Sequence, residues 1–392
     1  MLLNCSSALV EQAGLPEKEL CACWIRVENG KITEIASHLP ERGEEIIDLS
    51  GMTVLPGLID THIHGYAGFD TMDGDPQALR AMSRELLKAG VTAFLPTTMT
   101  AFAPDIHKAL SAVGGLVEQE TGGAKILGAF AEGPFISVEH RGAQPLDAIS
   151  PVDIPLLEQM VKSSRGTLRK MIIAPEIPQA ADCCRWMKEH GILPAIGHTS
   201  ATWEQTMACV EAGASVSVHT FNGMKGLHHR EPAVLGAVLG SDRILAELIF
   251  DGIHVHPEAA RVLLRAKGSD EIVLISDCMR AGGMADGEYM LGDTKTFVKN
   301  GVARTGEGAL AGSTLKLIDG VSNMIRWLGV SLAEAVKMAS RNPARELGLE
   351  QSLGSIAKGK RAHIIAMDGE GNVRFAMVDG RIRLQDGQLL PE

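Results

Sequence analysis

Eight short apolar stretches alternate with helix-like stretches through the middle of this 392-residue chain, and this alternation limits the fold more than any other feature. The apolar stretches span residues 54–59, 92–96, 126–131, 170–174, 193–196, 215–218, 245–250 and 272–275. Helical periodicity marks the segments between them, such as 76–89, 154–163, 180–190, 202–212 and 257–267. Strands that alternate with helices form parallel sheets, and eight such strands close a barrel. The sequence therefore predicts an α/β fold, a (β/α)8 TIM barrel, with further helices over 314–328 and 331–347.

Both ends of the chain lack this alternation and are rich in short strands. Asn-Gly at 29–30 and Asp-Gly at 379–380 each separate two apolar runs, which is the strongest short signal for a β-hairpin. We expect the two ends to build one small β-sandwich domain from residues 1–56 and 354–392. The catalytic barrel is then expected over residues 57–353.

Composition excludes several classes of protein. The formal net charge of −11 disfavours nucleic acid as a partner. The seven cysteines are odd in number and include no Cys-X-X-Cys pair, which is typical of reduced, cytoplasmic thiols. The first residues show no basic segment before an apolar core, and no apolar run reaches the roughly 18 residues of a membrane span. We expect a cytoplasmic protein with no membrane partner.

Side chains that can bind a metal or titrate follow six of the expected strands. They are His62 and His64, Glu132, His198, His219, His254 and Asp277. The pair His62 and His64 is spaced so that both point to one side of a strand. Each residue alone could be a packed side chain or a helix cap, but in a barrel all six strand ends meet at the face that carries active sites. Nitrogen and oxygen donors without a thiolate suit one or two divalent ions of Zn, Fe, Co or Mn.

Longer motifs around these residues resemble a known family. The motifs, from about residue 50 to 365, are PGLIDTHIHG, FLPTTMT, GAFAEGPF, IGHTSA, HTFNGMKGLHHREP, DGIHVHPE, SDCMRAGG, LAGS, ASRNPARELGL and GSIAKGKRA. They resemble the amidohydrolase superfamily and, within it, the N-acetylglucosamine-6-phosphate deacetylases. The block from HTFNGM to HHREP and the DGIHV motif are specific to these deacetylases, whereas His-X-His is shared across the superfamily.

The resemblance implies roles for the strand-end residues. Glu132, His198 and His219 match the ligands of the metal that the family always holds. The pair His62 and His64 matches the ligands of a second metal, which some members lack. Asp277 matches the catalytic carboxylate, which would take a proton from water and return it to the departing amine.

The resemblance also implies a set of substrate-binding residues. Asn222, the backbone at Gly223, Arg230 and His254 match the residues that bind the sugar phosphate. The family is usually a homodimer in which the residue matching Arg230 reaches the neighbouring site. Gln144 stands where many members have a histidine thought to polarise the acetyl carbonyl; its amide can donate a hydrogen bond but carries no charge.

The reaction implied is removal of the acetyl group from N-acetyl-D-glucosamine 6-phosphate, in amino-sugar catabolism, to give D-glucosamine 6-phosphate and acetate. N-acetylgalactosamine 6-phosphate is an alternative substrate, because the two sugars differ at one hydroxyl. A cyclic-amide hydrolase is disfavoured, because such enzymes use a carbamylated lysine and the fourth strand ends in Ala174-Pro175-Glu176. A non-catalytic barrel used for assembly is the alternative from another class, and the full set of ligands disfavours it.

Overall fold

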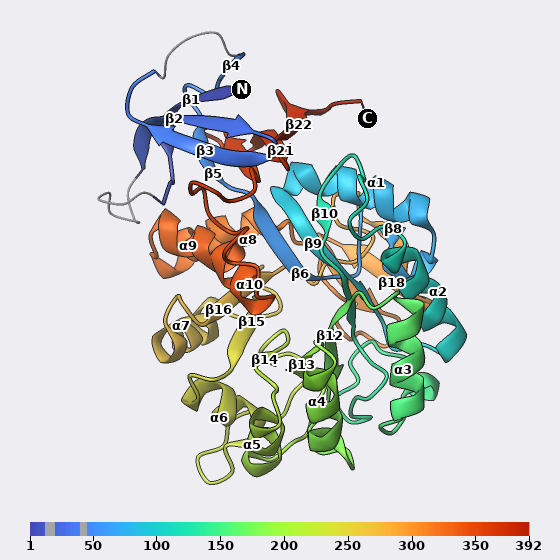
Figure 1. Cartoon of the computed structure of the whole chain (residues 1–392). Coiled ribbons are helices and arrows are strands. Elements are labelled where there is room, and N and C mark those ends of the chain that lie inside the picture. Colours follow the sequence, from blue (N-terminus) through green and yellow to red (C-terminus); the bar gives the residue numbers. More distant parts are fainter. Residues whose placement is uncertain (12–19, 40–44, 392) are drawn as a thin grey trace.

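The computed structural model describes residues 1–11, 20–39 and 45–391 (Figure 1). It contains an eight-membered parallel barrel and a separate sheet to which both ends of the chain contribute. Residues 12–19, 40–44 and 392 of the expected terminal domain lie outside the described residues.

The barrel confirms the predicted α/β fold, because consecutive strands pair in parallel around it. Its strands are β6 (Leu58–Ile63), β9 (Val91–Thr98), β10 (Lys125–Ile126) with β11 (Ala129–Ala131), β12 (Leu168–Ile173), β13 (Leu193–Ile196), β14 (Val216–Ser217), β15 (Leu245–Ile249) and β16 (Ile272–Ile275). These strands are buried on both faces, which explains why they read as continuous apolar runs in the sequence.

Two predicted strand boundaries were wrong. The run 54–59 is divided at Gly57 between the barrel strand β6 and β5 (Thr53–Pro56), which pairs with the C-terminal part of the chain. The run 126–131 is interrupted at Leu127-Gly128. Both runs stay apolar across the break, so hydrophobic pattern alone could not place it.

The barrel closes between β6 and β16 through hydrogen bonds outside a regular ladder. The Asp277 N–H donates to the His62 carbonyl at 2.9 Å, and the N–H groups of His64 and Gly65 both donate to the Cys278 carbonyl at 2.9 Å. The closure therefore lies at the carboxyl ends of these strands, where the candidate site residues stand.

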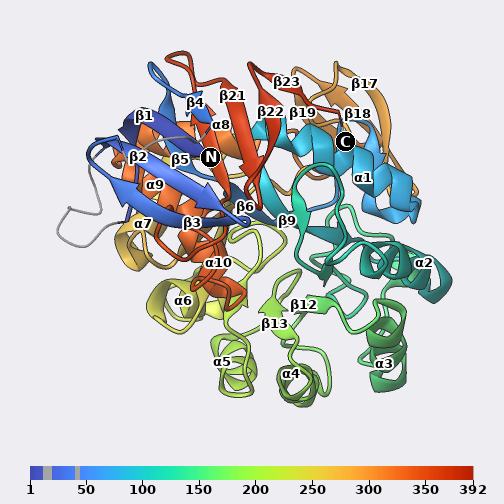
Figure 2. The same ribbon diagram turned by 45° about the horizontal axis from the view of Figure 1, so that its top comes forward.

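The helices surround the barrel, as Figure 2 shows. They are α1 (Pro76–Leu86), α2 (Ala103–Gly114), α3 (Ile154–Ser163), α4 (Ala180–Glu189), α5 (Trp203–Glu211), α6 (Ala233–Gly240), α7 (Pro257–Lys267), α8 (Leu317–Asn323) with a π-helical continuation (Met324–Leu328), α9 (Leu332–Ala339) and α10 (Arg341–Glu346). Short 3-10 helices occupy Thr71–Asp73, Leu87–Ala89 and Leu146–Ala148. The segment expected as one helix over 331–347 divides at Ser340 into α9 and α10. In the part of the chain that the structure describes, no helix is both long and apolar enough to cross a membrane.

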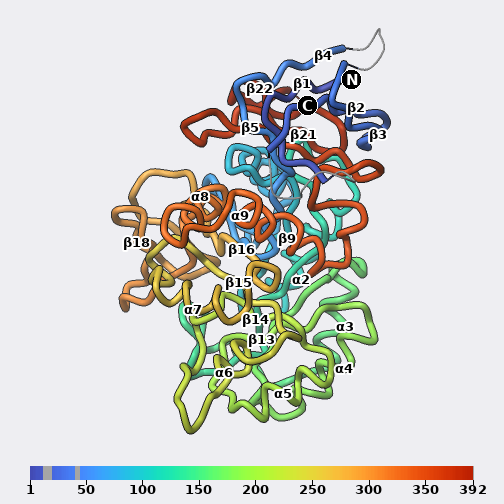
Figure 3. The backbone as a smooth tube through the Cα atoms, turned by 90° about the vertical axis from the view of Figure 1, so that its left-hand side faces the viewer, coloured from blue at the N-terminus to red at the C-terminus, as the bar shows by residue number. Residues whose placement is uncertain are grey.

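The two ends of the chain form one sheet, which lies beside the barrel in Figures 1 and 3. Its strands run in the order β23 (Gln388–Leu389), β22 (Arg381–Gln385), β21 (Val373–Val378), β20 (Ile364–Met367), β5, β1 (Leu2–Ala8), β2 (Cys21–Glu28) and β3 (Lys31–Ala36), with β4 (Ile46–Asp48) on β1. The hairpin turns expected at 29–30 and 379–380 are both present, and each has two residues with positive φ. The residue bounds of the two domains stay predictions.

Two small antiparallel elements follow barrel strands and were not predicted. One is the hairpin β7 (Gly65–Tyr66) and β8 (Phe69–Asp70). The other is a meander of β17 (Gly287–Leu291), β18 (Thr294–Lys299) and β19 (Val302–Thr305), inserted between β16 and α8. The meander brings Leu291 to the cleft described below.

Gly57→Ala should destabilise the protein, because Gly57 joins the sheet to the barrel at a point of close contact. A Cβ atom there would lie 2.2 Å from Thr92 Oγ1 and 2.4 Å from Thr92 Cγ2. Thr92 is fully buried and β-branched, so its side chain cannot turn away freely. We expect a loss of about 1–3 kcal/mol in the free energy of unfolding, measured by urea denaturation. Gly369→Ala, whose Cβ would meet open space, is the control, and equal stability of the two variants would contradict the prediction.

Candidate metal centre and active site

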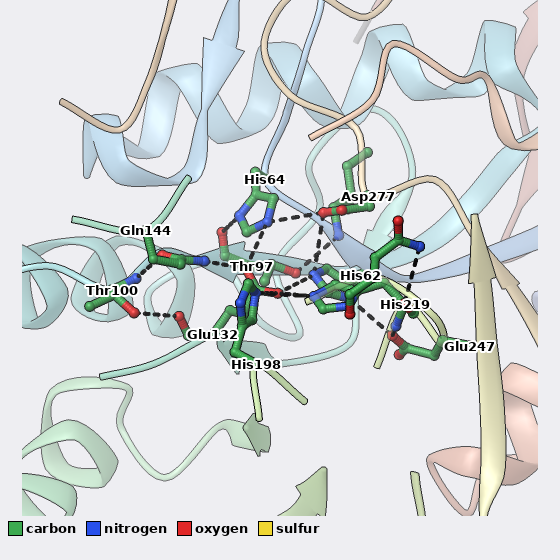
Figure 4. A network of polar contacts seen from close by, with 12 residues as sticks. His62, His64, Thr97, Thr100, Glu132, Gln144, His198, His219, Glu247 and Asp277 are labelled. Carbon is green, nitrogen blue, oxygen red and sulfur yellow. Dashed lines mark hydrogen bonds and ion pairs between the residues drawn. The ribbon is translucent and has the colours of Figure 1, made fainter. Parts of the chain in front are cut away.

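The strand ends bring the predicted metal and catalytic residues into one cluster (Figure 4). His62 lies near the end of β6 and His64 just beyond it, whereas Glu132 directly follows β11. The other three follow their strands within two residues: His198 after β13, His219 after β14 and Asp277 after β16. All six are buried, and the most exposed of them, Asp277, shows only 8% of its surface.

Three of these residues leave their strands in the left-handed backbone conformation. The φ angles are 44° at His198, 29° at His219 and 49° at Asp277. Such angles cost non-glycine residues roughly 1–3 kcal/mol each and persist only where the surroundings enforce them. In all three cases the left-handed residue lies two residues beyond the end of its strand, and its side chain belongs to the cluster.

Glu132 lies between two groups of histidines. Its Oε1 lies 3.0 Å from His219 Nε2, 3.2 Å from His62 Nε2 and 3.4 Å from His198 Nε2, and its Oε2 lies 3.2 Å from His64 Nε2. Among the described residues, two triads could each hold an ion: His62, His64 and Glu132, and Glu132, His198 and His219. Glu132 belongs to both triads and could bridge two metals.

The four histidines share one hydrogen-bonding arrangement. In each histidine, Nδ1 points away from Glu132 and lies within hydrogen-bonding distance of an oxygen atom. These oxygens are Glu247 Oε2 at 3.0 Å for His62, the Thr97 carbonyl at 3.2 Å for His64, the His140 carbonyl at 2.7 Å for His198 and the Asn222 carbonyl at 3.1 Å for His219. A carbonyl can only accept, so it fixes the proton on Nδ1 and leaves the Nε2 lone pair free. All four Nε2 atoms face Glu132, which is the arrangement of imidazoles that bind a metal.

The charges and lone pairs of the cluster also fit a cation. Burial disfavours the charged form of His62, but the negative charges of Glu132, Asp277 and Glu247 outweigh burial and raise the pKa of His62 to about 10. The Nε2 atoms of His198 and His219 lie 3.2 Å apart, a distance at which two lone pairs repel. A divalent cation would supply the positive charge and take both lone pairs, so the residues present fit a divalent metal.

Asp277 lies beside the triad of His62, His64 and Glu132, and its Oδ1 accepts no hydrogen bond from the described residues. This oxygen is buried and lies 3.2 Å from His64 Nε2 and 3.4 Å from His62 Nε2. Burial would raise the pKa of this carboxyl, but the neighbouring His62 and His64 lower it below its usual value. Asp277 is therefore held as a carboxylate that can accept a proton.

A cleft opens above the cluster, with an empty volume of about 760 Å³ that includes open solvent. Asn222, Gly223 and His254 line it, as the sequence predicted. Gly223 has φ 59°, and a Cβ there would lie 3.0 Å from His198 Nδ1, so glycine permits this close approach. Burial opposes the charged form of His254, but the Asp251 carboxylate, 2.7 Å from its Nδ1, raises the pKa of His254.

Arg230 is not among the described residues that line this cleft. It lies exposed on the loop before α6, and its guanidinium contacts the His229 ring nitrogen at 2.7 Å. Within one chain, the structure therefore does not bring Arg230 to the rest of the predicted substrate-binding set.

Gln144 lines the cleft but is also bound to the metal cluster. Its Oε1 accepts the Thr100 N–H at 2.8 Å, which fixes the orientation of the amide. Its Nε2 therefore faces Glu132 and donates to Glu132 Oε2 at 2.7 Å. The side chain thus holds Glu132 as well as lining the cleft.

Sequence reasoning missed three buried charged residues beneath the cluster. Glu247 on β15 accepts from His62 Nδ1, Lys170 on β12 contacts Glu247, and Glu346 at the end of α10 lies 2.6 Å from Lys170 Nζ. The available signal was a charged residue inside an otherwise apolar strand: Glu in LAELI, and Lys next to Arg in LRKMII. Lys170 is paired with two carboxylates, Glu247 and Glu346, and this pairing also disfavours a carbamylated lysine at this position.

Comparisons with known proteins agree with this geometry. The profile of the amidohydrolase family matches residues 53–383. The N-acetylglucosamine-6-phosphate deacetylase of Vibrio furnissii is 42% identical over 91% of this chain and 89% of its own length. The N-acetylgalactosamine-6-phosphate deacetylase of Escherichia coli O157:H7 is 39% identical over 97% and 98% of the two chains. The structure of a mutant N-acetyl-D-glucosamine-6-phosphate deacetylase from Mycobacterium smegmatis, in complex with N-acetyl-D-glucosamine-6-phosphate, has a TM-score of 0.91 at 29% identity and covers 98% of this chain and 99% of its own.

Glu132→Gln and His64→Asn should differ in how many metal ions the protein retains. Glu132 belongs to both triads, so its replacement should weaken both sites, whereas His64→Asn should weaken one. Mutation of a residue that only hydrogen-bonds to a metal ligand typically lowers metal affinity roughly 10–100-fold. We expect a larger loss of zinc affinity here, because these substitutions change the candidate ligands themselves. Zinc content per chain after gel filtration, measured by mass spectrometry, checks this. Equal loss in the two variants would contradict a shared Glu132.

Proposed function

The chain belongs to the amidohydrolase family, and from that membership we propose that it removes the acetyl group from N-acetyl-D-glucosamine 6-phosphate. The products are D-glucosamine 6-phosphate and acetate, in amino-sugar catabolism. The observation that carries this proposal is the pair of His/Glu triads that share Glu132 next to Asp277 in an open cleft. The 42% identity to a deacetylase of this substrate supports it.

The chemistry divides between a metal and Asp277. Glu132, His198 and His219 would hold one divalent ion, and His62, His64 and Glu132 would hold a second. A divalent ion of Zn, Fe, Co or Mn makes water a stronger nucleophile and polarises a carbonyl. Asp277 takes a proton from the attacking water and delivers it to the sugar nitrogen as the C–N bond breaks.

The rest of the cleft binds and orients the sugar phosphate. The Asp251 carboxylate favours the protonated, positively charged form of His254. His254 lines the cleft, where it can bind the phosphate or a ring hydroxyl. Asn222 and the backbone at Gly223 offer further polar groups. Gln144 Nε2 has a second N–H besides the one donated to Glu132, and this N–H can reach the acetyl oxygen as a neutral donor.

N-acetylgalactosamine 6-phosphate is the second candidate substrate. A relative that acts on this epimer is 39% identical over almost the whole of both chains, close to the 42% of the other relative. A non-catalytic assembly role fits poorly with a buried cluster that retains every predicted ligand and Asp277.

The active unit is proposed to be a cytoplasmic homodimer. Arg230 stands exposed outside the cleft of its own chain, and its planar guanidinium suits the bidentate binding of a phosphate in a neighbouring site. All seven cysteines are free, which suits a reducing compartment.

Purified enzyme loaded with zinc or cobalt should release acetate from N-acetyl-D-glucosamine 6-phosphate. Asp277→Asn should lower kcat roughly 10²–10⁴-fold, because the proton carrier is lost while the shape is kept. Removal of the metal by a chelator should abolish turnover until metal is restored. The assay includes the galacto epimer and the unphosphorylated sugar, and the ratio of kcat/KM values identifies the substrate. No release from either sugar phosphate by metal-loaded enzyme would refute the proposal.

Arg230→Ala and Asp277→Asn should complement each other if Arg230 serves the partner subunit. In an equal mixture of exchanged subunits, half of the dimers are mixed, and each mixed dimer has one intact site. We expect each variant alone to be nearly inactive and the mixture to recover about a quarter of wild-type activity. An Asp277→Asn and Asp277→Ala mixture is the control, since it restores no site. Absence of recovery in exchanged dimers would show that Arg230 acts within its own chain or not at all.

A further inference from the structure

A chain of buried charges runs beneath the candidate metal centre and ends on one ligand. Lys170 Nζ contacts Glu247 Oε1, lies 2.6 Å from Glu346 Oε1 and lies 4.6 Å from the centre of the Phe130 ring. Glu346 Oε2 accepts the Thr61 hydroxyl at 2.8 Å. The side chains of Lys170, Glu247 and Glu346 are all fully buried, so none of them is solvated by bulk water.

Glu247 uses its two oxygens differently. Its Oε1 faces Lys170, whereas its Oε2 lies 3.0 Å from His62 Nδ1 and also accepts the His219 N–H at 3.2 Å. The neighbours of Glu247 along β15, Ala246 and Leu248, pack in the cluster covered by helices. Because side chains alternate along a strand, Glu247 points the other way, into the barrel.

His62 differs from the other three histidines in what fixes its proton. The Nδ1 atoms of His64, His198 and His219 face backbone carbonyls, which accept only and which no side-chain substitution removes. His62 Nδ1 faces a side chain, Glu247 (Figure 4). The availability of the His62 Nε2 lone pair therefore depends on the group at position 247.

We infer that Glu247 is a positioning residue that holds His62 in the metal-binding tautomer, and that Lys170 orients Glu247 for this task. The inference concerns the second ion of the proposed function, the one held by His62, His64 and Glu132. It assigns a role to two residues that touch neither substrate nor metal.

Replacement of Glu247 by glutamine should reverse the tautomer. An amide has one acceptor oxygen, and two donor-only groups compete for it, Lys170 and the His219 N–H. We expect Lys170 to take it, because a hydrogen bond from a charged donor is stronger than one from a neutral N–H. The amide N–H₂ would then face His62 Nδ1, which must become an acceptor, so the proton moves to Nε2. A protonated Nε2 cannot bind a metal.

The test is zinc titration with a chromophoric competitor, combined with the zinc content per chain after gel filtration. We expect two ions in the wild type, and roughly 10–100-fold weaker binding of the second ion alone in Glu247→Gln. Glu346→Gln is the matched control, because it removes the same charge from the same network without touching His62, and it should retain both ions. In Lys170→Met/Glu247→Gln no ammonium competes for the amide oxygen, which can again accept from His62 Nδ1, so this variant should recover the second ion.

Circular dichroism and thermal unfolding establish that each variant is folded. If Glu247→Gln does not fold, the double variant decides, and loss of its second ion would overturn the inference. So would a wild type that binds one ion, a folded Glu247→Gln that keeps wild-type affinity at both sites, or equal losses in Glu247→Gln and Glu346→Gln. Metal binding is read without any substrate, so a failed deacetylase assay would leave these outcomes unaffected.

Discussion

The carboxylate of Glu132 is the group around which the functional end of the barrel is arranged. It is buried, it carries negative charge, and four imidazole Nε2 atoms lie within 3.4 Å of its oxygens. A buried charge is costly unless it is paired, and an imidazole whose one proton lies on Nδ1 does not neutralise it. The charge therefore favours a cation beside it, either a proton on His62, whose pKa it helps to raise, or a metal ion. The outward hydrogen bonds of the four Nδ1 atoms direct the Nε2 atoms inward, so the cluster is complete only with a cation. His198 and His219 join this cluster from residues in the left-handed backbone conformation.

Three residues of the cluster, His62, His64 and Asp277, also take part in closing the barrel. The closure between β6 and β16 consists of bonds from the Asp277 N–H to His62 and from His64 and Gly65 to Cys278. Two candidate metal ligands, His62 and His64, and the proposed proton carrier Asp277 are therefore part of the closure of the barrel. These backbone hydrogen bonds connect the segment that carries Asp277 directly to the segment that carries His62 and His64, so they help to fix the position of Asp277 relative to this pair.

Much of the site could be predicted because the carboxyl ends of all barrel strands lie at one face, so residues that directly follow the strands come close together. His62, His64, Glu132, His198, His219 and Asp277 were predicted from their position after apolar runs, and the structure brings all six together. Glu247, Lys170 and Glu346 escaped prediction because Lys170 meets the two carboxylates across 77 and 176 residues of sequence. Hydrophobic pattern cannot show that such distant charges meet. The break at Gly57 escaped because apolar residues continue through it, although the two sides serve different sheets.

The amide of Gln144 has a contact in the structure that its sequence position does not reveal. From sequence, its amide is a weaker substitute for a charged imidazole that would polarise an acetyl group. In the structure the amide already donates to Glu132 Oε2, on the side of that carboxylate where His64 lies. A protonated imidazole there would add a positive charge against the cations that the triads are built to hold, whereas a neutral amide adds none. The glutamine therefore donates a hydrogen bond to Glu132 without placing a further positive charge beside the two triads.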